Sequence, residues 1–90
     1  MPRYFMHLRD GTDELLDPDG REFPSLDALR EAVLSTARDL ICGDVVKGLI
    51  DLRYRIDAED GQGAVVCTLP FAQAVNIIPA EASLASAREA

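Results

Sequence analysis

The sequence predicts an α+β fold of two layers, in which a small antiparallel sheet from two hairpins is covered on one face by one long amphipathic helix. Apolar and polar residues alternate near the start of the chain, apolar residues recur at helical spacing in the middle, and alternation then returns. Strands that precede and follow a single helix are typical of a helix packed on an antiparallel sheet. A chain of 90 residues holds one core, so we expect a single domain over residues 1–78.

The first hairpin is expected between residues 3 and 23. The strand over residues 3–9 has an apolar side with Tyr4, Met6 and Leu8. Its other side carries Arg3, Phe5, His7 and Arg9. Leu15 and Leu16 form a short second strand, the run Asp17-Pro18-Asp19-Gly20 matches a type I turn, and residues 21–23 form a third, very short strand.

The helix is expected to begin after Ser25, whose side chain can cap the first turn. Its apolar stripe consists of Leu26, Leu29, Val33, Ala37 and Leu40, with Leu34, Ile41 and Val45 on a flank. We place its end near Cys42, because Gly43 can adopt the left-handed cap conformation and Asp44 would otherwise fall within the stripe. Continuation through Gly43 towards Gly48 is the alternative.

The second hairpin follows the helix. Leu52, Tyr54, Ile56 and Ala58 alternate with Arg53, Arg55 and Asp57, and residues 64–69 are β-branched and apolar. A loop of about five residues joins the two strands. Residues 71–75 have the spacing of a short helical turn that places Phe71 on the core. Residues 79–90 are rich in Ala, and we expect a disordered tail there.

Composition narrows the function classes. The formal charge of -7 argues against general binding to DNA or RNA, since phosphate backbones are bound mainly through Lys and Arg. No apolar run approaches the roughly 18 residues needed to cross a bilayer, and the start of the chain lacks the features of a signal peptide, so we expect a cytoplasmic protein. Cys42 and Cys67 lack the spacing of a zinc site, and we expect both to be reduced and mostly buried. His7 is the only histidine, and we expect neither a metal nor a cofactor.

Three stretches together carry a resemblance to a known family: the opening RYFMHLRDG, the turn DPDG with the helix that follows, and the closing LPFAQAV. They resemble a family of short bacterial proteins that is described only as a domain of unknown function, over roughly residues 2–77. Met6 stands where a second Phe is expected, and Gln73 where an acidic residue is usual. The resemblance implies a domain name and no mechanism.

A weaker similarity connects residues 20–32 with the partial RNase H-like domain of HicB-type antitoxins. The similar positions are Gly20, Phe23, Ser25, Leu26, Ala28, Leu29 and Ala32. This similarity implies a small module that binds a protein partner and dimerises without catalysis. Because one fold serves many functions, it remains an analogy of fold.

No catalytic constellation is visible: Gly61-Gln62-Gly63 precedes a strand and lacks the third glycine of a dinucleotide site. The leading hypothesis is therefore a non-enzymatic interaction or regulatory module, homodimeric or bound to another protein, that uses the open sheet face or an edge strand. The alternative is binding of a small anion or single-stranded nucleic acid on the open face. The candidate binding residues are Arg3, Phe5, His7, Arg9, Arg53 and Arg55.

Overall fold

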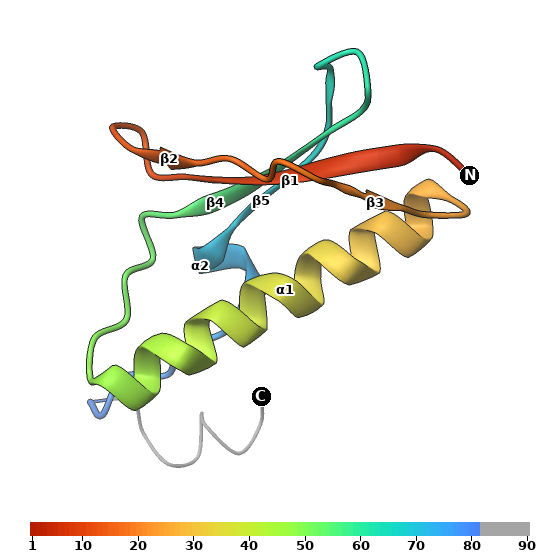
Figure 1. Cartoon of the computed structure of the whole chain (residues 1–90). Helices are drawn as coiled ribbons and strands as arrows, with labels where there is room; N and C mark the ends of the chain where they lie inside the picture. The colour runs from red at the N-terminus through yellow and green to blue at the C-terminus, as the bar shows by residue number, and fades with distance from the viewer. Residues whose placement is uncertain (82–90) are drawn as a thin grey trace.

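A computed structural model describes residues 1–81 as an antiparallel sheet with one long and one short helix on the same side (Figure 1). The strands are β1 (Arg3–Arg9), β2 (Glu14–Leu15), β3 (Arg21–Glu22), β4 (Arg55–Glu59) and β5 (Val65–Pro70). The helices are α1 (Leu26–Lys47) and α2 (Phe71–Ala74). The predicted α+β class is confirmed.

Strand β1 lies at the centre of the sheet, whose order is β2-β1-β4-β5. Strand β3 also pairs with β1, near the end of β1 opposite to β2. The returning segment of the first hairpin therefore pairs with β1 at two places, through β2 and through β3. The turn over residues 17–20 lies between these two short strands. On its other side β1 pairs with β4, and this register places His7 opposite Asp57 and Arg9 opposite Arg55.

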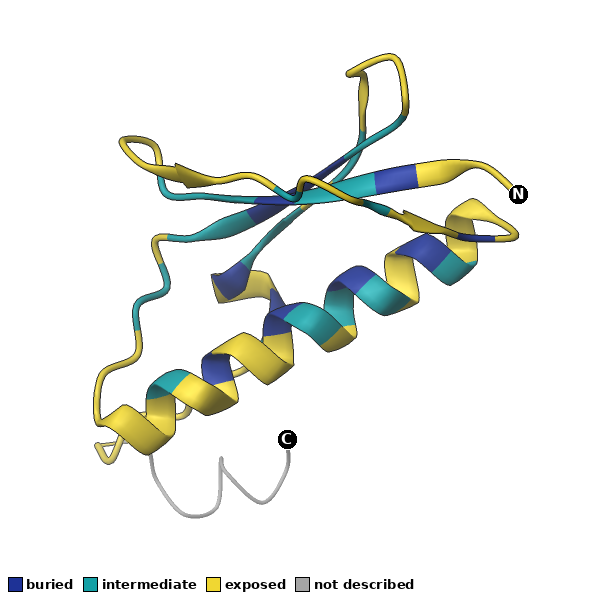
Figure 2. Ribbon diagram, in the orientation of Figure 1, coloured by how far each residue is buried: buried dark blue, intermediate teal, exposed yellow. Residues whose placement is uncertain are grey.

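The core lies between α1 and the sheet. The buried residues of α1 recur every four positions, at Leu29, Val33, Ala37 and Ile41. They form one cluster with residues from β1, β4, α2 and the segment after β3, namely Tyr4, Phe23, Ile56, Ala58, Phe71 and Ala74. Figure 2 places the buried positions of α1 on the side that faces the sheet and α2. The predicted helical turn at residue 71 is confirmed, and Phe71 is buried.

Helix α1 is longer than the predicted helix, which was placed to end near Cys42. It continues to Lys47, and Gly48 ends it with φ 86° and an N–H directed at the carbonyls of Asp44 and Val45. Gly43 is tolerated inside α1 because that position is exposed, where glycine costs only about 1 kcal/mol relative to alanine. The end of α1 extends away from the sheet, so continuation does not force Asp44 into the core (Figure 1).

Three further expectations about the helix are wrong, namely that Leu26, Leu40 and Cys42 are buried. Leu40 is exposed and Ile41 is buried in its place, because the buried stripe advances by four residues at each step. Cys42 is exposed, while Cys67 is partly buried. Leu26 at the first turn is also exposed, because α1 begins at the margin of the sheet.

Strand β4 begins at Arg55, later than the predicted strand that included Leu52 and Arg53. Residues 49–54 instead form the connection from α1, which ends where Tyr54 accepts a hydrogen bond from the Phe71 N–H. The prediction for the tail lies mostly outside the described residues, and residues 79–81 contain a turn. Within residues 1–81, neither helix combines the length and apolar character that a bilayer span requires.

Candidate functional site

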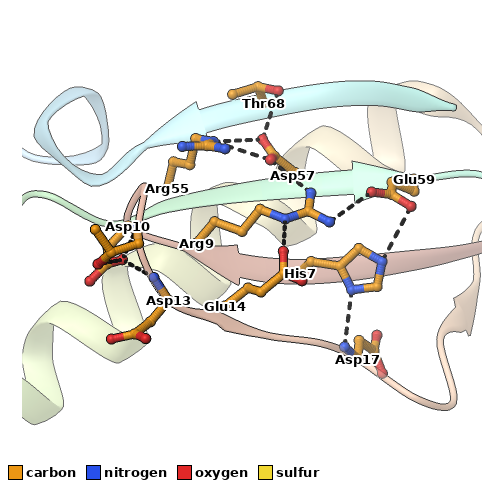
Figure 3. Close-up of polar contacts among 11 residues, drawn as sticks. His7, Arg9, Asp10, Asp13, Glu14, Asp17, Arg55, Asp57, Glu59 and Thr68 are labelled. Atoms are coloured by element: carbon orange, nitrogen blue, oxygen red, sulfur yellow. Dashed lines mark hydrogen bonds and ion pairs between the residues drawn. The ribbon is translucent and has the colours of Figure 1, made fainter. Parts of the chain in front are cut away.

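The face of the sheet opposite α1 carries a group of polar side chains from three strands (Figure 3). Strand β1 contributes His7 and Arg9. Strand β4 contributes Arg55, Asp57 and Glu59, and β5 contributes Thr68. We call these six residues the polar face. They meet because alternate residues of a strand point to the same side and the register aligns the three strands.

Asp57 is the centre of the polar face. Its carboxylate accepts hydrogen bonds from Arg9 Nη1 at 2.9 Å, Arg55 Nε at 3.1 Å and Thr68 Oγ1 at 3.0 Å. Burial raises the pKa of Asp57, but the hydrogen bonds from Arg9, Thr68 and Arg55 outweigh it, so the pKa lies below its usual range. Asp57 therefore stays ionised in a position where only 5% of the residue is exposed.

Arg9 connects three carboxylates. Besides Asp57, its guanidinium donates from Nε to Glu14 at 2.9 Å and from Nη2 to Glu59 at 3.1 Å. The hydrogen bonds to Glu14 and then Asp57 raise the pKa of Arg9 most, with a further contribution from Glu59. The planar guanidinium is suited to this role because its donors diverge in fixed directions. Arg9 thereby connects strand β2 to strand β4.

His7 is buried and both of its ring nitrogens have partners. Nδ1 accepts a hydrogen bond of 3.1 Å from the Asp17 backbone N–H, and Nε2 lies 3.4 Å from Glu59 Oε1. An Nδ1 that accepts a hydrogen bond carries no proton, so the neutral ring has its hydrogen on Nε2, the nitrogen that lies near Glu59. The ring also stacks on Phe5, with centroids 6.5 Å apart. Because these contacts use both ring nitrogens and one ring face, His7 has a structural role in the polar face.

The turn over residues 17–20 is attached to β1 at the gap between β2 and β3. Asp17 accepts hydrogen bonds from the backbone N–H groups of Met6, Asp19 and Gly20, at 3.1 to 3.2 Å. Burial raises the pKa of Asp17, but the hydrogen bonds from these backbone donors, Gly20 first, outweigh it, so the net shift of the pKa is downward. Gly20 has φ 68°, and a Cβ there would lie 2.7 Å from the Tyr4 carbonyl oxygen and 2.8 Å from the Phe5 ring. The turn therefore needs glycine at residue 20.

The structure brings together four of the six predicted binding residues: Phe5, His7, Arg9 and Arg55. Arg3 lies at the start of β1, where it is 3.6 Å from Glu22 and donates to the Asp19 carbonyl. Arg53 was expected on a strand beside Arg55, but it lies before β4 and pairs with Asp51 at 2.8 Å. A short connection replaces the strand at this point, so Arg53 does not join the polar face.

Sequence reasoning missed the carboxylates that neutralise these arginines. Asp57 alternates with Arg55 in the sequence, which was a usable signal that it shares the face. Glu59 and Glu14 carried no comparable signal, because their contacts with Arg9 depend on long-range register and on the path of a turn. Throughout residues 1–81, no fully buried side-chain nitrogen or oxygen lacks a hydrogen-bond partner.

A hollow of about 480 Å³ adjoins the polar face and is lined by Arg9, Gly11, Thr12, Asp13, Glu14 and Arg55. One wall is the turn after β1, where Asp10 Oδ1 accepts hydrogen bonds from the backbone N–H groups of Asp13 and Thr12. Those two donors, Asp13 first, lower the pKa of Asp10. Within the described residues, no cluster of three or more His, Cys, Asp or Glu side chains is arranged to hold a metal ion.

The two edges of the sheet differ. One edge is divided between β2 and β3, which have two residues each and are separated by the turn over residues 17–20. The other edge is β5, six residues long, with no charged side chain in VVCTLP. In residues 1–81 the only strand paired with β5 is β4. The Phe71 N–H donates to the Tyr54 carbonyl, which lies just before β4. Because backbone groups of successive residues in a strand point to opposite sides, those of Pro70 and Thr68 point away from β4, to the free edge.

Taken together, these features define a small α+β domain with a helix-covered antiparallel sheet, an ion-paired open face and one free strand edge. The chain belongs to the family described as Domain of unknown function (DUF6894), whose model matches residues 3–72. The family resemblance predicted from the opening and closing motifs is thereby confirmed. Comparison with curated proteins and with solved structures found no match. The similarity to HicB-type antitoxins stays a prediction.

Proposed function

We propose that this protein is a non-enzymatic interaction or regulatory module that forms a homodimer by pairing the free edge of β5. One observation carries the proposal: β5 is a six-residue edge strand without a charged side chain, whereas the opposite edge is divided into two short strands. Unpaired edge strands bind other strands readily, and proteins usually guard them with charges, proline, bulges, short length or a covering segment. Strand β5 ends in Pro70 and its pairing with β4 shifts beside Glu59, but it carries no charge and is longer than β2 or β3, so its middle favours a partner strand.

A second copy of this chain is the partner that fits best. Each copy carries a net charge of -7, so a contact surface must keep acidic groups apart. The uncharged residues of β5 allow close approach with little local repulsion. A two-fold contact between identical strands is also self-complementary, because each copy offers the same donors and acceptors.

The polar face supports a role without catalysis. Its charged groups are engaged with one another: Arg9 with three carboxylates, and Asp57 with two arginines and Thr68. His7 has partners on both ring nitrogens, so neither nitrogen is directed at a bound substrate. This arrangement fits a face that holds three strands together and thereby positions β5.

Native mass spectrometry and sedimentation velocity of the full chain, from low to high micromolar concentration, test the dimer. We expect Val65→Lys to weaken association, because Val65 is exposed at the start of β5 and the substitution adds a charge to the edge strand of each copy. Val46→Lys is the matched control, since it makes the same change in charge at an exposed position of α1. A monomer at high micromolar concentration contradicts the proposal, and so does a dimer weakened equally by both variants.

Binding of a small anion is the second candidate, favoured by the hollow beside Arg55. In the described residues Arg55 donates hydrogen bonds from Nε to Asp57, and its side chain is 39% exposed and lines the hollow. Asp13 and Glu14 line the same hollow and oppose anion binding, which places this candidate second. Calorimetric titration with inorganic phosphate and with an oligothymidylate tests it. Binding unchanged by Arg55→Ala, relative to the helix variant Arg30→Ala, contradicts it.

A further inference from the structure

The helix-facing side of the sheet is left partly uncovered at one end, where α1 extends away from the sheet (Figure 1). We propose that a cleft at this end, formed by two hollows that share Tyr54, binds a segment of another protein in which aliphatic side chains are flanked by Lys or Arg. The cleft shares no residue with β5, so its binding does not depend on the proposed dimer.

The apolar stripe of α1 continues beyond the part that is buried. Its buried residues recur every four positions up to Ile41. The next position in this series is Val45, which is 53% exposed, and Leu49, just after the end of α1, is 72% exposed. Contiguous apolar side chains left in solvent mark surfaces that bind partners.

The two hollows extend from β2 to the end of α1. One, of about 180 Å³, has an apolar lining of Leu8, Leu15 and Tyr54. The other, of about 330 Å³, has an apolar lining of Leu49 and Tyr54. Leu8 packs against the core, and Leu15 is its partner in the register of β1 with β2, so both point to the side of the sheet that faces α1. The cleft therefore has aliphatic residues at both ends and an aromatic ring between them.

Acidic side chains border the cleft on both sides. Asp13 and Glu14 line the hollow beside β2, and Asp44 and Asp51 line the hollow beside α1. Lys47 also lines the second hollow, so carboxylates outnumber cations there by two to one. The lining therefore carries an excess of negative charge, in a chain whose formal net charge is -7.

Two of these carboxylates are available to a partner. Arginines that do not line the cleft neutralise the other two, those of Glu14 and Asp51. Asp13 and Asp44 have no ion-pair partner in the part of the chain that the structure describes. Since one of them lines each hollow, a cation of the partner can pair with a carboxylate on either side of the apolar lining.

The charge of the cleft determines which occupant fits. Its apolar lining favours aliphatic side chains, and its unpaired carboxylates favour Lys or Arg beside them. Grooves of this kind commonly bind a short amphipathic segment of another protein. A second copy of this chain fits less well, because its charge of -7 adds to the negative charge already present.

Three short fluorescein-labelled peptides test this chemistry on the full chain. The first combines leucine with lysine, the second leucine with glutamate, and the third serine with lysine. We expect fluorescence polarisation to detect binding of the leucine–lysine peptide only, and amide chemical shifts to change most at the residues that line the cleft. No binding of that peptide, or equal binding of either of the others, contradicts the proposal.

Substitutions at exposed apolar positions locate the site. We expect Leu15→Ser combined with Leu49→Ser to raise the dissociation constant of the leucine–lysine peptide by roughly tenfold or more, because both apolar contacts are lost. Val46→Ser combined with Ile78→Ser is the matched control, since these two aliphatic residues are also exposed but line neither hollow. Equal effects of the two pairs would place the peptide elsewhere and overturn the proposal.

A second pair of variants separates the cleft from the net charge. Asp13→Asn combined with Asp44→Asn should weaken binding by about three- to tenfold. Glu31→Gln combined with Asp39→Asn makes the same change in net charge at exposed positions of α1 outside the cleft, so we expect a smaller effect. Equal weakening by both pairs contradicts the proposal.

Sedimentation velocity of the Leu15→Ser, Leu49→Ser variant tests a second copy as the occupant. We expect the same oligomeric state as in the unaltered chain, because the cleft is open to a different protein. A loss of association in this variant would show that another copy of the chain fills the cleft, and the proposal would be wrong.

Discussion

The backbone N–H of Asp17 donates a 3.1 Å hydrogen bond to Nδ1 of His7, which joins the tight turn between β2 and β3 to the open face of the sheet. On its other side His7 approaches Glu59 of β4. One imidazole therefore connects the turn, the central strand and β4 across the polar face (Figure 3).

Removal of this imidazole should destabilise the domain. We expect His7→Ala to lower the free energy of unfolding by about 1–3 kcal/mol, because the Asp17 N–H loses its acceptor and a cavity opens beside Phe5. Urea unfolding followed by circular dichroism measures the change. Arg53→Ala serves as the control, since its pair with Asp51 is exposed and should leave the unfolding midpoint nearly unchanged. Equal effects of the two substitutions would contradict the structural role of His7.

The tautomer of His7 can be observed directly. Nitrogen-15 NMR at neutral pH should detect the hydrogen on Nε2, because Nδ1 accepts the Asp17 N–H. A neutral ring with its hydrogen on Nδ1 would be incompatible with this contact.

Asp57 should make stability depend on pH in the acidic range. The pKa of Asp57 in the folded protein lies below its ordinary value of 3.8, so as pH falls the unfolded chain takes up a proton before the folded protein does. The contribution of Asp57 to the free energy of unfolding is therefore complete above the unfolded pKa and is lost as pH falls towards the folded pKa. We expect Asp57→Asn to lower stability at neutral pH and to flatten the decline below about pH 4. Unfolding curves from neutral to acidic pH measure this, and an unchanged acid slope would contradict it.

Two glycines should respond in opposite directions to alanine. Gly20→Ala places a Cβ against the Tyr4 carbonyl at a positive φ, so we expect a loss of stability greater than about 1 kcal/mol. Gly43→Ala adds a methyl group to an exposed helical position with nothing within 4 Å, so we expect a gain of about 0.5–1 kcal/mol. Thermal unfolding compares the two. A gain at residue 20 would contradict the described turn.

Salt should strengthen the proposed dimer. Two copies with a charge of -7 each repel at long range, and added salt screens that repulsion while it leaves the uncharged β5 contact intact. Sedimentation velocity at low and moderate concentrations of sodium chloride measures the dissociation constant. Weaker association at higher salt would indicate an interface held by ion pairs and would contradict pairing through β5.

The chain's local patterns were sufficient for the element order and for much of the core. Period-two alternation predicted β1, and period-four spacing predicted the part of α1 that contains Leu29, Val33 and Ala37. The end of α1 was predicted too early, because Gly43 was read as a cap. Whether a glycine ends a helix depends on what surrounds the next turn, and here that turn extends beyond the sheet.

The candidate site divides in the same way. The alternation of β1 determined by itself that Phe5, His7 and Arg9 share the face opposite the core, because side chains of a strand alternate whatever lies beside it. Only the tertiary structure decided that Asp57, Glu59 and Glu14 neutralise Arg9, and that Arg53 stays apart. Those contacts depend on the register between strands distant in sequence and on the path of connecting segments. The same dependence left β5, and no other strand, as the long free edge of the described sheet.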